Sequence, residues 1–326
     1  MSNYNAWVMR GDVAIIKETD YYRLVSEDCS LNIKVVNQHV DRLIYDLSYS
    51  GACRPSNDYH ACLVFDEMKR KGLIHISPLN TLSPLETLQW TWNESFAPNQ
   101  SLSSKLKASK VLIVGCGGTG SIIAQSLAGS GVGHFTLIDF DVVSVGNLNR
   151  QFVFGIDDVN NYKAQVLAKK IMESQKVLSV NVHLAEIKST EQLDKMSKSV
   201  DLIICCADEP KGEIHKIVAE SACNVGAAAL FGAVGIKKGV IGPTLINKKS
   251  FHSYISWLNE IEMLHKRVIA PPKYPSNGVS NSIIANMIAW EALQFLSGMT
   301  HLKTEACVLS FNLNSFSTSM LKGFDK

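Results

Sequence analysis

Residues 110–150 read KVLIVGCGGTGSIIAQSLAGSGVGHFTLIDFDVVSVGNLNR, and this stretch decides the fold. An apolar, largely β-branched run from Lys110 to Val114 predicts a buried strand, and a glycine turn follows it. Small and apolar residues from Ser121 to Ser130 predict a helix. Residues His134 to Ile138 predict a second strand, which ends at Asp139. Strand, glycine turn, helix and acid-ended strand is the order of a nucleotide-binding βαβ unit.

The glycines of the turn have separate roles in such a unit. Gly115 allows the tight turn, Gly117 lets the backbone approach a phosphate, and Gly120 allows helix and strand to pack closely. Together with Gly118 they form a predicted phosphate cradle. The N-terminus of the following helix offers unpaired N–H groups and a positive dipole end to an anion. On its own, this pattern favours an ordinary dinucleotide-binding domain that uses NAD.

A polar cluster just past the second strand indicates a different ligand. It comprises Asp139, Asp141, Asn147, Arg150 and Gln151. An NAD site needs one acid here, for the ribose, and no arginine after it. Because the carboxyl ends of parallel strands open into a crevice, the acid and the cation would face one ligand. A nucleoside triphosphate accounts for both.

Two residues further along complete a candidate ATP site. Lys163 lies in the first turn of a predicted amphipathic helix, where a plain surface lysine is the alternative. Asp208 follows the apolar strand DLIICCA, and its alternative is a cap on a helix that opens at Pro210. With Asp139 on the ribose, Arg150 and Lys163 would offset phosphate charge, and Asp208 would hold Mg²⁺.

The same residues restrict the reaction type. No G-x-x-x-x-G-K-[ST] motif occurs, which disfavours transfer of the γ-phosphoryl group. The groups instead suit attack by a carboxylate on the α-phosphorus of ATP. Cations would then offset the charge that develops as pyrophosphate leaves.

The motifs GCGGTG, LIDFD, NLNRQ, NYKAQ and CADEP occur in the order found in the E1-like (ThiF/MoeB/HesA) adenylating family, which the chain resembles over about residues 104–313. The resemblance implies ATP and Mg²⁺, and commonly a homodimer. It assigns Asp139 to the ribose, Asn147, Arg150 and Lys163 to phosphates, and Asp208 to magnesium. We therefore expect catalytic roles for Arg150, Lys163 and Asp208, and nucleotide contacts from Gly115, Gly117, Gly118, Gly120, Asp139, Asp141, Asn147 and Gln151.

Three departures from the family pattern narrow the function. None of the eight cysteines forms a C-x-x-C pair, so no zinc is expected. No cysteine lies between Cys223 and Cys307, which disfavours the thioester relay of the ubiquitin-activating members. An arginine that often precedes the glycine strand is missing, and Lys105 and Lys107 are the only cations near its position.

Length and composition bound the rest. A chain of 326 residues, 46% of them hydrophobic, predicts a main α/β domain and one smaller unit. The formal net charge of +2 disfavours a partner such as nucleic acid or a membrane surface. The opening residues carry no apolar signal segment, and no apolar run is long enough to span a bilayer. We expect a cytoplasmic protein.

Residues 1–77 are predicted to form a separate, winged-helix-like α+β unit. VAIIKETD and YYRLVSED predict two short strands, two stretches of helical spacing follow, and Leu73 to Ile76 predicts a last strand. Such a unit binds DNA, takes up a peptide as an added strand, or stabilises a dimer. It resembles the precursor-peptide recognition domain of enzymes that modify ribosomal peptides. The strand Tyr21 to Ser26, beside the helix Asp58 to Lys71, is the candidate peptide groove.

The composition of residues 78–109 predicts a linker, and its Trp90, Trp92 and Phe96 are expected to pack along the main domain. Residues 110–326 are predicted to form a Rossmann-like, doubly wound, mostly parallel sheet. KKGVIGPTLINKK is expected to add an antiparallel strand, and Pro271 to Gly278 to form a mobile crossover loop.

A zinc-free adenylating domain behind a peptide-recognition domain is similar to the pantocin A type of the family. That resemblance implies ATP-driven activation of glutamate side chains in a ribosomal precursor peptide, leading to cyclisation in antibiotic biosynthesis. The alternatives are adenylation of a peptide C-terminus, as in the microcin C7 type, or of a sulfur-carrier protein. A nucleotide-sensing, winged-helix regulator that binds DNA is the alternative from another class.

Overall fold

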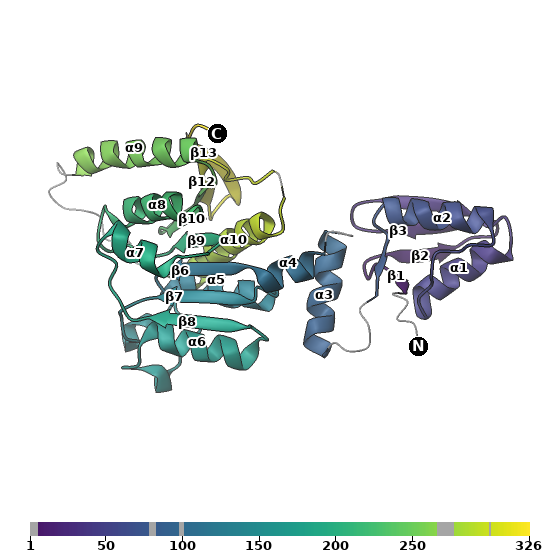
Figure 1. Cartoon of the computed structure of the whole chain (residues 1–326), viewed down its shortest axis with the longest axis horizontal. Helices are drawn as coiled ribbons and strands as arrows, with labels where there is room; N and C mark the ends of the chain where they lie inside the picture. The colour runs from purple at the N-terminus through teal and green to yellow at the C-terminus, as the bar shows by residue number, and fades with distance from the viewer. Residues whose placement is uncertain (1–5, 78–82, 98–100, 266–276, 300) are drawn as a thin grey trace. The chain divides into compact units, whose positions relative to one another are not determined.

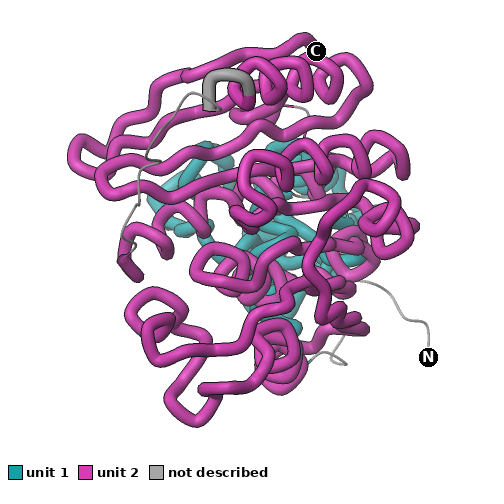
Figure 2. The backbone as a smooth tube through the Cα atoms, turned by 90° about the vertical axis from the view of Figure 1, so that its left-hand side faces the viewer, with its two compact units in different colours: residues 1–104 teal, residues 105–326 magenta. Residues whose placement is uncertain are grey.

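The computed structural model describes residues 6–77, 83–97, 101–265, 277–299 and 301–326 (Figure 1). The chain divides into two compact units, Met1–Ser104 and Lys105–Lys326 (Figure 2). Most of the predicted crossover loop, Pro271 to Gly278, lies outside the described residues.

The N-terminal unit is an α+β fold with two small antiparallel sheets. One sheet has the order β2-β3-β4 and the other pairs β1 with β5. The elements are β1 (Trp7–Met9), β2 (Ala14–Lys17), β3 (Tyr21–Val25), β4 (Ser30–Lys34), α1 (Gln38–Tyr49), α2 (Tyr59–Arg70) and β5 (Ile74–Ile76). Helix α1 begins at Gln38 because the Asn37 side chain accepts hydrogen bonds from His39 N and Val40 N. Its apolar stripe, which was predicted from the spacing, is buried in the core of the unit.

The predicted peptide groove at Tyr21 to Ser26 is wrong as a place for an added strand. Strand β3 is the central strand and pairs with β2 on one side and with β4 on the other. Its backbone groups are therefore used in the sheet, and only β2 and β4 have a free edge within it. The pattern analysis missed β4, whose sequence SLNIK alternates but contains only two apolar residues.

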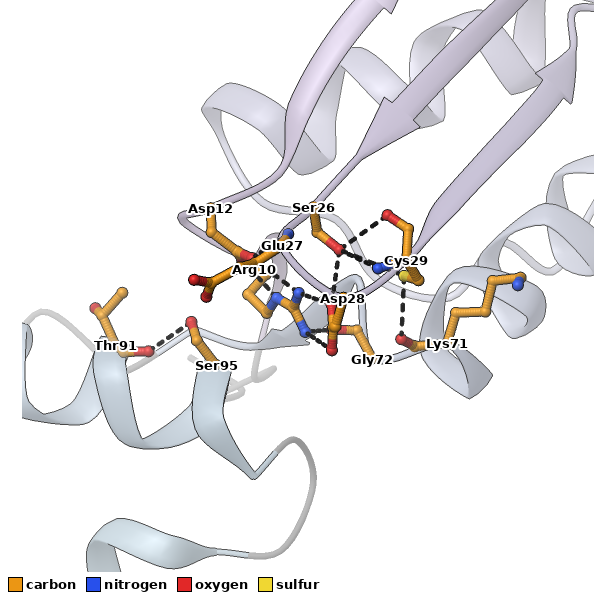
Figure 3. Close-up of polar contacts among 10 residues, drawn as sticks. All are labelled: Arg10, Asp12, Ser26, Glu27, Asp28, Cys29, Lys71, Gly72, Thr91 and Ser95. Carbon is orange, nitrogen blue, oxygen red and sulfur yellow. Dashed lines mark hydrogen bonds and ion pairs between the residues drawn. The ribbon is translucent and has the colours of Figure 1, made fainter. Parts of the chain in front are cut away.

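A buried arginine joins three turns of the N-terminal unit (Figure 3). Arg10 is only 4% exposed. Its guanidinium donates to Asp12 Oδ1 at 2.5 Å, to Asp28 Oδ1 at 2.5 Å and to the Gly72 carbonyl at 3.3 Å. Because an unpaired charge is costly to bury, these partners hold together the turn before β2, the turn between β3 and β4, and the turn before β5.

Two helices occupy the segment predicted as a linker. They are α3 (Pro84–Phe96) and α4 (Leu102–Ala108). Ser83 and Glu86 form a capping box at the start of α3, which explains how a Pro- and Ser-rich stretch begins a helix. Trp90 packs edge-on against His75, with 4.9 Å between ring centroids, so α3 lies against the N-terminal unit.

The second unit contains an eight-stranded sheet of order β13-β12-β11-β10-β9-β6-β7-β8. Its parallel strands are β6 (Lys110–Val114), β7 (His134–Ile138), β8 (Ser179–His183), β9 (Leu202–Cys205) and β10 (Ala228–Val234); β11 (Lys238–Leu245), β12 (Cys307–Asn312) and β13 (Ser317–Gly323) are antiparallel additions. The predicted parallel sheet with an antiparallel extension is confirmed. The strand order reverses beside β6, so the carboxyl ends of β6 and β9 form the switch point at which such sheets bind ligands.

Helices cover both faces of this sheet. They are α5 (Gly118–Gly129), α6 (Lys163–Ser174), α7 (Thr190–Met196), α8 (Ile214–Val225), α9 (Lys248–His265) and α10 (Gly278–Leu296). On β10, Phe231 packs in the core with α8 and α9. A Cβ on its neighbour Gly232 would lie 2.2 Å from Ile288 of α10. Because successive strand residues face opposite sides, α8 and α10 cover opposite faces, as a doubly wound fold requires.

Candidate functional site

The glycine turn after β6 rests directly on the end of β9. Gly115 has a φ of +93°, and a Cβ there would lie 2.8 Å from the backbone N of Ala207. A Cβ on Gly120 would lie 1.9 Å from the Gly115 carbonyl oxygen. Both positions therefore exclude any larger residue, as predicted. The turn contacts Ala207, the residue before Asp208. The backbone of Asp208 therefore lies next to the glycine turn.

Helix α5 begins at Gly118, three residues before the predicted start at Ser121. The N-cap is Gly117, and no side chain caps the first turn. The first N–H groups of α5 are therefore available to a ligand, and the positive dipole end favours an anion. Binding of a phosphate by this cradle stays a prediction.

Gly118 is a glycine for a reason that the sequence pattern did not reveal. A Cβ at this position would lie 2.7 Å from Asn281 Oδ1, in the first turn of α10. Asn281 is 4% exposed and is the residue of this region that the sequence analysis missed. No local sequence signal marks Asn281, because the residue that it contacts, Gly118, lies more than 160 positions earlier in the chain.

Asp139 braces the glycine turn. Its Oδ2 accepts a hydrogen bond from Cys116 N at 2.6 Å, and its Oδ1 accepts one from Asp141 N at 2.8 Å. Burial raises the pKa of this carboxyl group, which is 9% exposed, and the two N–H donors oppose that rise. The carboxylate thus lies where β7 ends, beside the turn. Its contact with a ribose stays a prediction.

Lys163 and Asp141 form an ion pair. Lys163 Nζ lies 2.7 Å from Asp141 Oδ2, and the lysine side chain is only 8% exposed. A bridge between Val142 and Tyr162 brings the start of α6 to the end of β7. The surface-lysine alternative is therefore wrong: the ammonium group is buried at the sheet edge. Asp141, predicted as a nucleotide contact, binds this ammonium group.

The NLNRQ loop contains three predicted site residues. Asn147 Oδ1 accepts a hydrogen bond from Ser144 N and so fixes the loop. The Arg150 guanidinium is partly exposed and donates to Gly146 O at 3.0 Å. Gln151 is 3% exposed, and its Oε1 has no hydrogen-bond partner among the described residues. Its Nε2 lies 3.5 Å from the Cβ position of Gly117, which places this amide beside the cradle.

Asp208 is exposed, three residues beyond the end of β9. Helix α8 begins at Ile214 and not at Pro210, so Asp208 is not the N-cap of that helix. Mg²⁺ in nucleotide sites is held by one or two carboxylates together with phosphate oxygens and water. Within the described ranges, no three His, Cys, Asp or Glu side chains are grouped so as to hold a metal by themselves. The exposed carboxylate fits a magnesium ion shared with a nucleotide.

Lys105 does not replace the missing family arginine within its own chain. Its Nζ donates to the carbonyl of Ser297, the C-cap of α10. The cradle lies at the other end of this 19-residue helix, roughly 28 Å away at 1.5 Å per residue.

The described helices include none that is long and apolar enough to cross a bilayer.

Comparison with known proteins agrees with this geometry. A sequence profile of the ThiF family matches residues 93–326. A probable molybdopterin-synthase adenylyltransferase of Porphyra purpurea is 26% identical over 222 residues, which are 67% of this chain and 56% of that protein. The chain thus spans about half the length of that relative.

Two solved structures share the fold of almost the whole chain. E. coli MccB with ATP superposes with a TM-score of 0.76 and 18% identity, over 98% of both chains. PaaA superposes with a TM-score of 0.72 and 17% identity, over 97% of this chain and 99% of the other. At these identities the likeness shows the fold alone, including that of the N-terminal unit. The profile covers well over half of the residues and every strand of the doubly wound sheet, so the chain belongs to the ThiF family.

Proposed function

We propose that this chain uses ATP to adenylate carboxylates of a ribosomally made precursor peptide. We propose further that these are glutamate side chains, whose activation leads to cyclisation in the biosynthesis of a peptide antibiotic. One observation carries the proposal: the glycine turn before the uncapped start of α5 lies against Ala207, the residue before the exposed Asp208, and the same turn is bonded to Asp139, two residues before the partner of the buried Lys163.

In the proposed reaction, a peptide carboxylate oxygen forms a bond to the α-phosphorus of ATP. The bond from that phosphorus to the oxygen bridging to the β-phosphorus breaks, and pyrophosphate leaves with the electron pair. The N–H groups of α5 bind phosphate oxygens, and Lys163 and Arg150 offset the charge of the leaving group. Asp208 would hold Mg²⁺, which supplies further positive charge to the phosphates.

Lys163 needs little rearrangement for this role. Its ammonium group already lies at the sheet edge, where Asp141 compensates its charge. Asp141 is 51% exposed, so its carboxylate remains accessible from solvent. The lysine keeps a counter-ion in the free protein and gains phosphate oxygens on binding.

We assign recognition of the peptide to residues 1–77, through the free edge of β4. Ser26 N donates to Cys29 O at one end of the β3–β4 pairing, and Val35 N donates to Asp20 O at the other. In an antiparallel pair only every second residue bonds to the partner strand, so this register assigns the bonds to Leu31 and Ile33 of β4. Ser30, Asn32 and Lys34 therefore direct their N–H and C=O groups outward, and all three are exposed. By the same parity, the β2 edge offers only Ile15 and Lys17. A peptide strand finds the longer template on β4.

The test measures ATP–pyrophosphate exchange with the cognate peptide in two variants, each with a single proline substitution. Asn32→Pro removes an outward N–H of β4, and Lys17→Pro removes one of β2. In both variants the edge strand keeps its hydrogen bonds to β3, because edge positions tolerate proline. We expect Asn32→Pro to raise the KM for peptide roughly tenfold or more, through a lost hydrogen bond and the bulk of the ring, with the KM for ATP unchanged.

Lys17→Pro should behave like the unmodified chain. The opposite order would place the peptide on β2, and no effect from either variant would refute recognition by strand addition. Absence of any pyrophosphate exchange with a peptide would refute the enzymatic proposal itself.

Two other substrates are distinguished by mass spectrometry of the product. MccB has been solved with AMPCPP and MccA, so adenylation of a peptide C-terminus is one candidate. The relative from Porphyra purpurea favours a sulfur-carrier protein as the other. Loss of water from glutamate residues supports the cyclase, an AMP adduct on the last residue supports the first alternative, and activity on a Gly-Gly-ending carrier supports the second.

We also propose a homodimer, on the family resemblance. Because Lys105 bonds to the far end of α10, any cation that replaces the missing arginine has to reach the cradle from elsewhere, and a second protomer can supply it. Sedimentation of the full chain tests this: a monomer that is fully active would contradict it.

A further inference from the structure

Helices α5 and α10 run side by side in the same direction. Thr119 Oγ1 donates to Asn281 Oδ1 at 3.4 Å in the first turns, and Ser126 Oγ donates to Asn286 Oδ1 at 2.7 Å further along. Both residue numbers rise together, so the two N-termini lie at the same end. Their positive dipole ends therefore adjoin each other at the cradle, an arrangement that an anion between them would stabilise.

Asn281 is the contact between these two N-termini. Its Nδ2 donates to the Asn277 carbonyl at 2.7 Å, which turns its Oδ1 toward α5. That oxygen lies 2.7 Å, and its Cγ 3.2 Å, from the place a Cβ would take on Gly118. The side chain is almost fully buried, and Gly118 is the residue that leaves room for it. A carboxamide, which is polar but uncharged, thus fills the space beside the first residue of the cradle.

We propose that Asn281 is a positioning residue for the triphosphate. It fixes the first turn of α5 from the side, and as a neutral group it leaves the positive end of the helix to the ligand. This inference rests on the proposed ATP site. It assigns a role at that site to Asn281, which lies outside the five family motifs of the sequence. The doubled glycine of GCGGTG follows from it: Gly117 faces the ligand, and Gly118 faces Asn281.

The experiment replaces one carboxamide by a carboxylate of the same shape. Asn281→Asp puts a negative charge at the adjoining N-termini of α5 and α10, which offsets the lost hydrogen bond to the Asn277 carbonyl, so the melting temperature should change little. The same charge repels the phosphates, so the Kd for Mg-ATP should rise roughly tenfold, the size of a like-charge contact at intermediate dielectric. A residue that only packs two helices would not separate stability from nucleotide affinity in this way.

Asn286→Asp is the matched control. Asn286 also joins α10 to α5, but it lies more than one turn away from the cradle and is exposed. Its variant should bind Mg-ATP as the unmodified chain does. Binding is measured by calorimetry on the full chain without peptide, together with thermal unfolding.

Equal affinity for Mg-ATP in Asn281→Asp and the unmodified chain would overturn the inference and leave the proposed function intact. A chain that does not bind Mg-ATP at all would overturn both. If Asn281→Asp does not fold, Asn281→Ser decides: an affinity reduced by about twofold to fivefold supports the inference, through the lost support of the turn, and an unchanged one refutes it.

Discussion

The two units of this chain differ in how open their charged side chains are to a ligand. In the N-terminal unit, Arg10 is buried between Asp12 and Asp28, and Lys17 pairs with Asp41. These charges neutralise one another, and the buried Arg10 joins three turns. In the ThiF unit, Asp208 is exposed, and Arg150 bonds only neutral oxygens of its own loop among the described contacts. The charges of the first unit thus satisfy one another, whereas in the ThiF unit Lys163 is paired with Asp141 but Asp208 and Arg150 stay at least partly open to solvent.

This difference explains what sequence comparison finds. Chemistry carried by side chains restricts residue identity, and the ThiF profile accordingly matches residues 93–326. Recognition by a strand edge depends on backbone groups that every residue except proline has. The N-terminal unit is matched as part of the whole-chain fold shared with MccB, whereas the profile begins at residue 93.

The largest expected effect comes from removing an exposed charge of the ThiF unit. Asp208→Ala should lower the pyrophosphate exchange rate roughly 100- to 1,000-fold, because the carboxylate that would hold Mg²⁺ is lost. The melting temperature should not change, since the side chain is exposed. Affinity for the peptide, measured by fluorescence anisotropy, should also stay the same. Glu209→Ala, at the adjacent exposed position, is the control and should retain exchange within about twofold.

A weaker effect separates packing from chemistry within the cradle. Gly120→Ala puts a Cβ at 1.9 Å from the Gly115 carbonyl, so the turn or the helix has to move. We expect a loss of about 3 kcal/mol or more in the free energy of unfolding. Gly129→Ala, in the same helix, meets no atom within 4 Å and should raise stability by about 0.5–1 kcal/mol. Urea denaturation measures both, and equal stabilities would contradict the close approach seen at Gly120.

The sequence predicted the strand–turn–helix core because those residues make local demands. Gly115 needs its positive φ, and the run that forms β6 is buried on both faces after its first residue. Lys163 was placed correctly in a first helical turn. Its partner Asp141 was assigned to the nucleotide, because the bridge that joins the two segments is formed only in the folded chain.

Features that depend on distant contacts were not predictable in the same way. Asn281 has no motif of its own, and its role follows from the missing Cβ of Gly118. The segment predicted as a linker forms α3 because a capping box outweighs its Pro- and Ser-rich composition. In the N-terminal unit, β3 cannot take up a peptide strand because it pairs with β2 and with β4. The sequence of one strand does not show which strands lie beside it.

The smallest effect compares the two units in acid, since each contains a histidine whose pKa its packed surroundings lower. Burial lowers the pKa of His215, beside Phe231 and Tyr254, from 6.5 to about 4, against the attraction of Asp208. Burial also lowers the pKa of His75, which is 2% exposed in the N-terminal unit. Below pH 6.5 each of these histidines is protonated in the unfolded chain but stays neutral in the folded chain until its lower folded pKa is reached. Stability therefore falls as the pH drops from 6.5 toward the folded pKa, by at most about 1.4 kcal/mol per pH unit and per histidine.

Urea denaturation at pH 7 and pH 5 checks this on the full chain. His215→Gln and His75→Gln should each reduce the stability lost between these pH values by up to about 2 kcal/mol, because glutamine does not titrate. His60→Gln, with an exposed ring on α2, should leave the loss unchanged. The raised pKa of Asp139 acts in the opposite sense, but it is common to all variants and cancels in the differences. If only one of the two buried histidines changes the loss, acid sensitivity belongs to that unit alone, and the parallel between the units fails at this point.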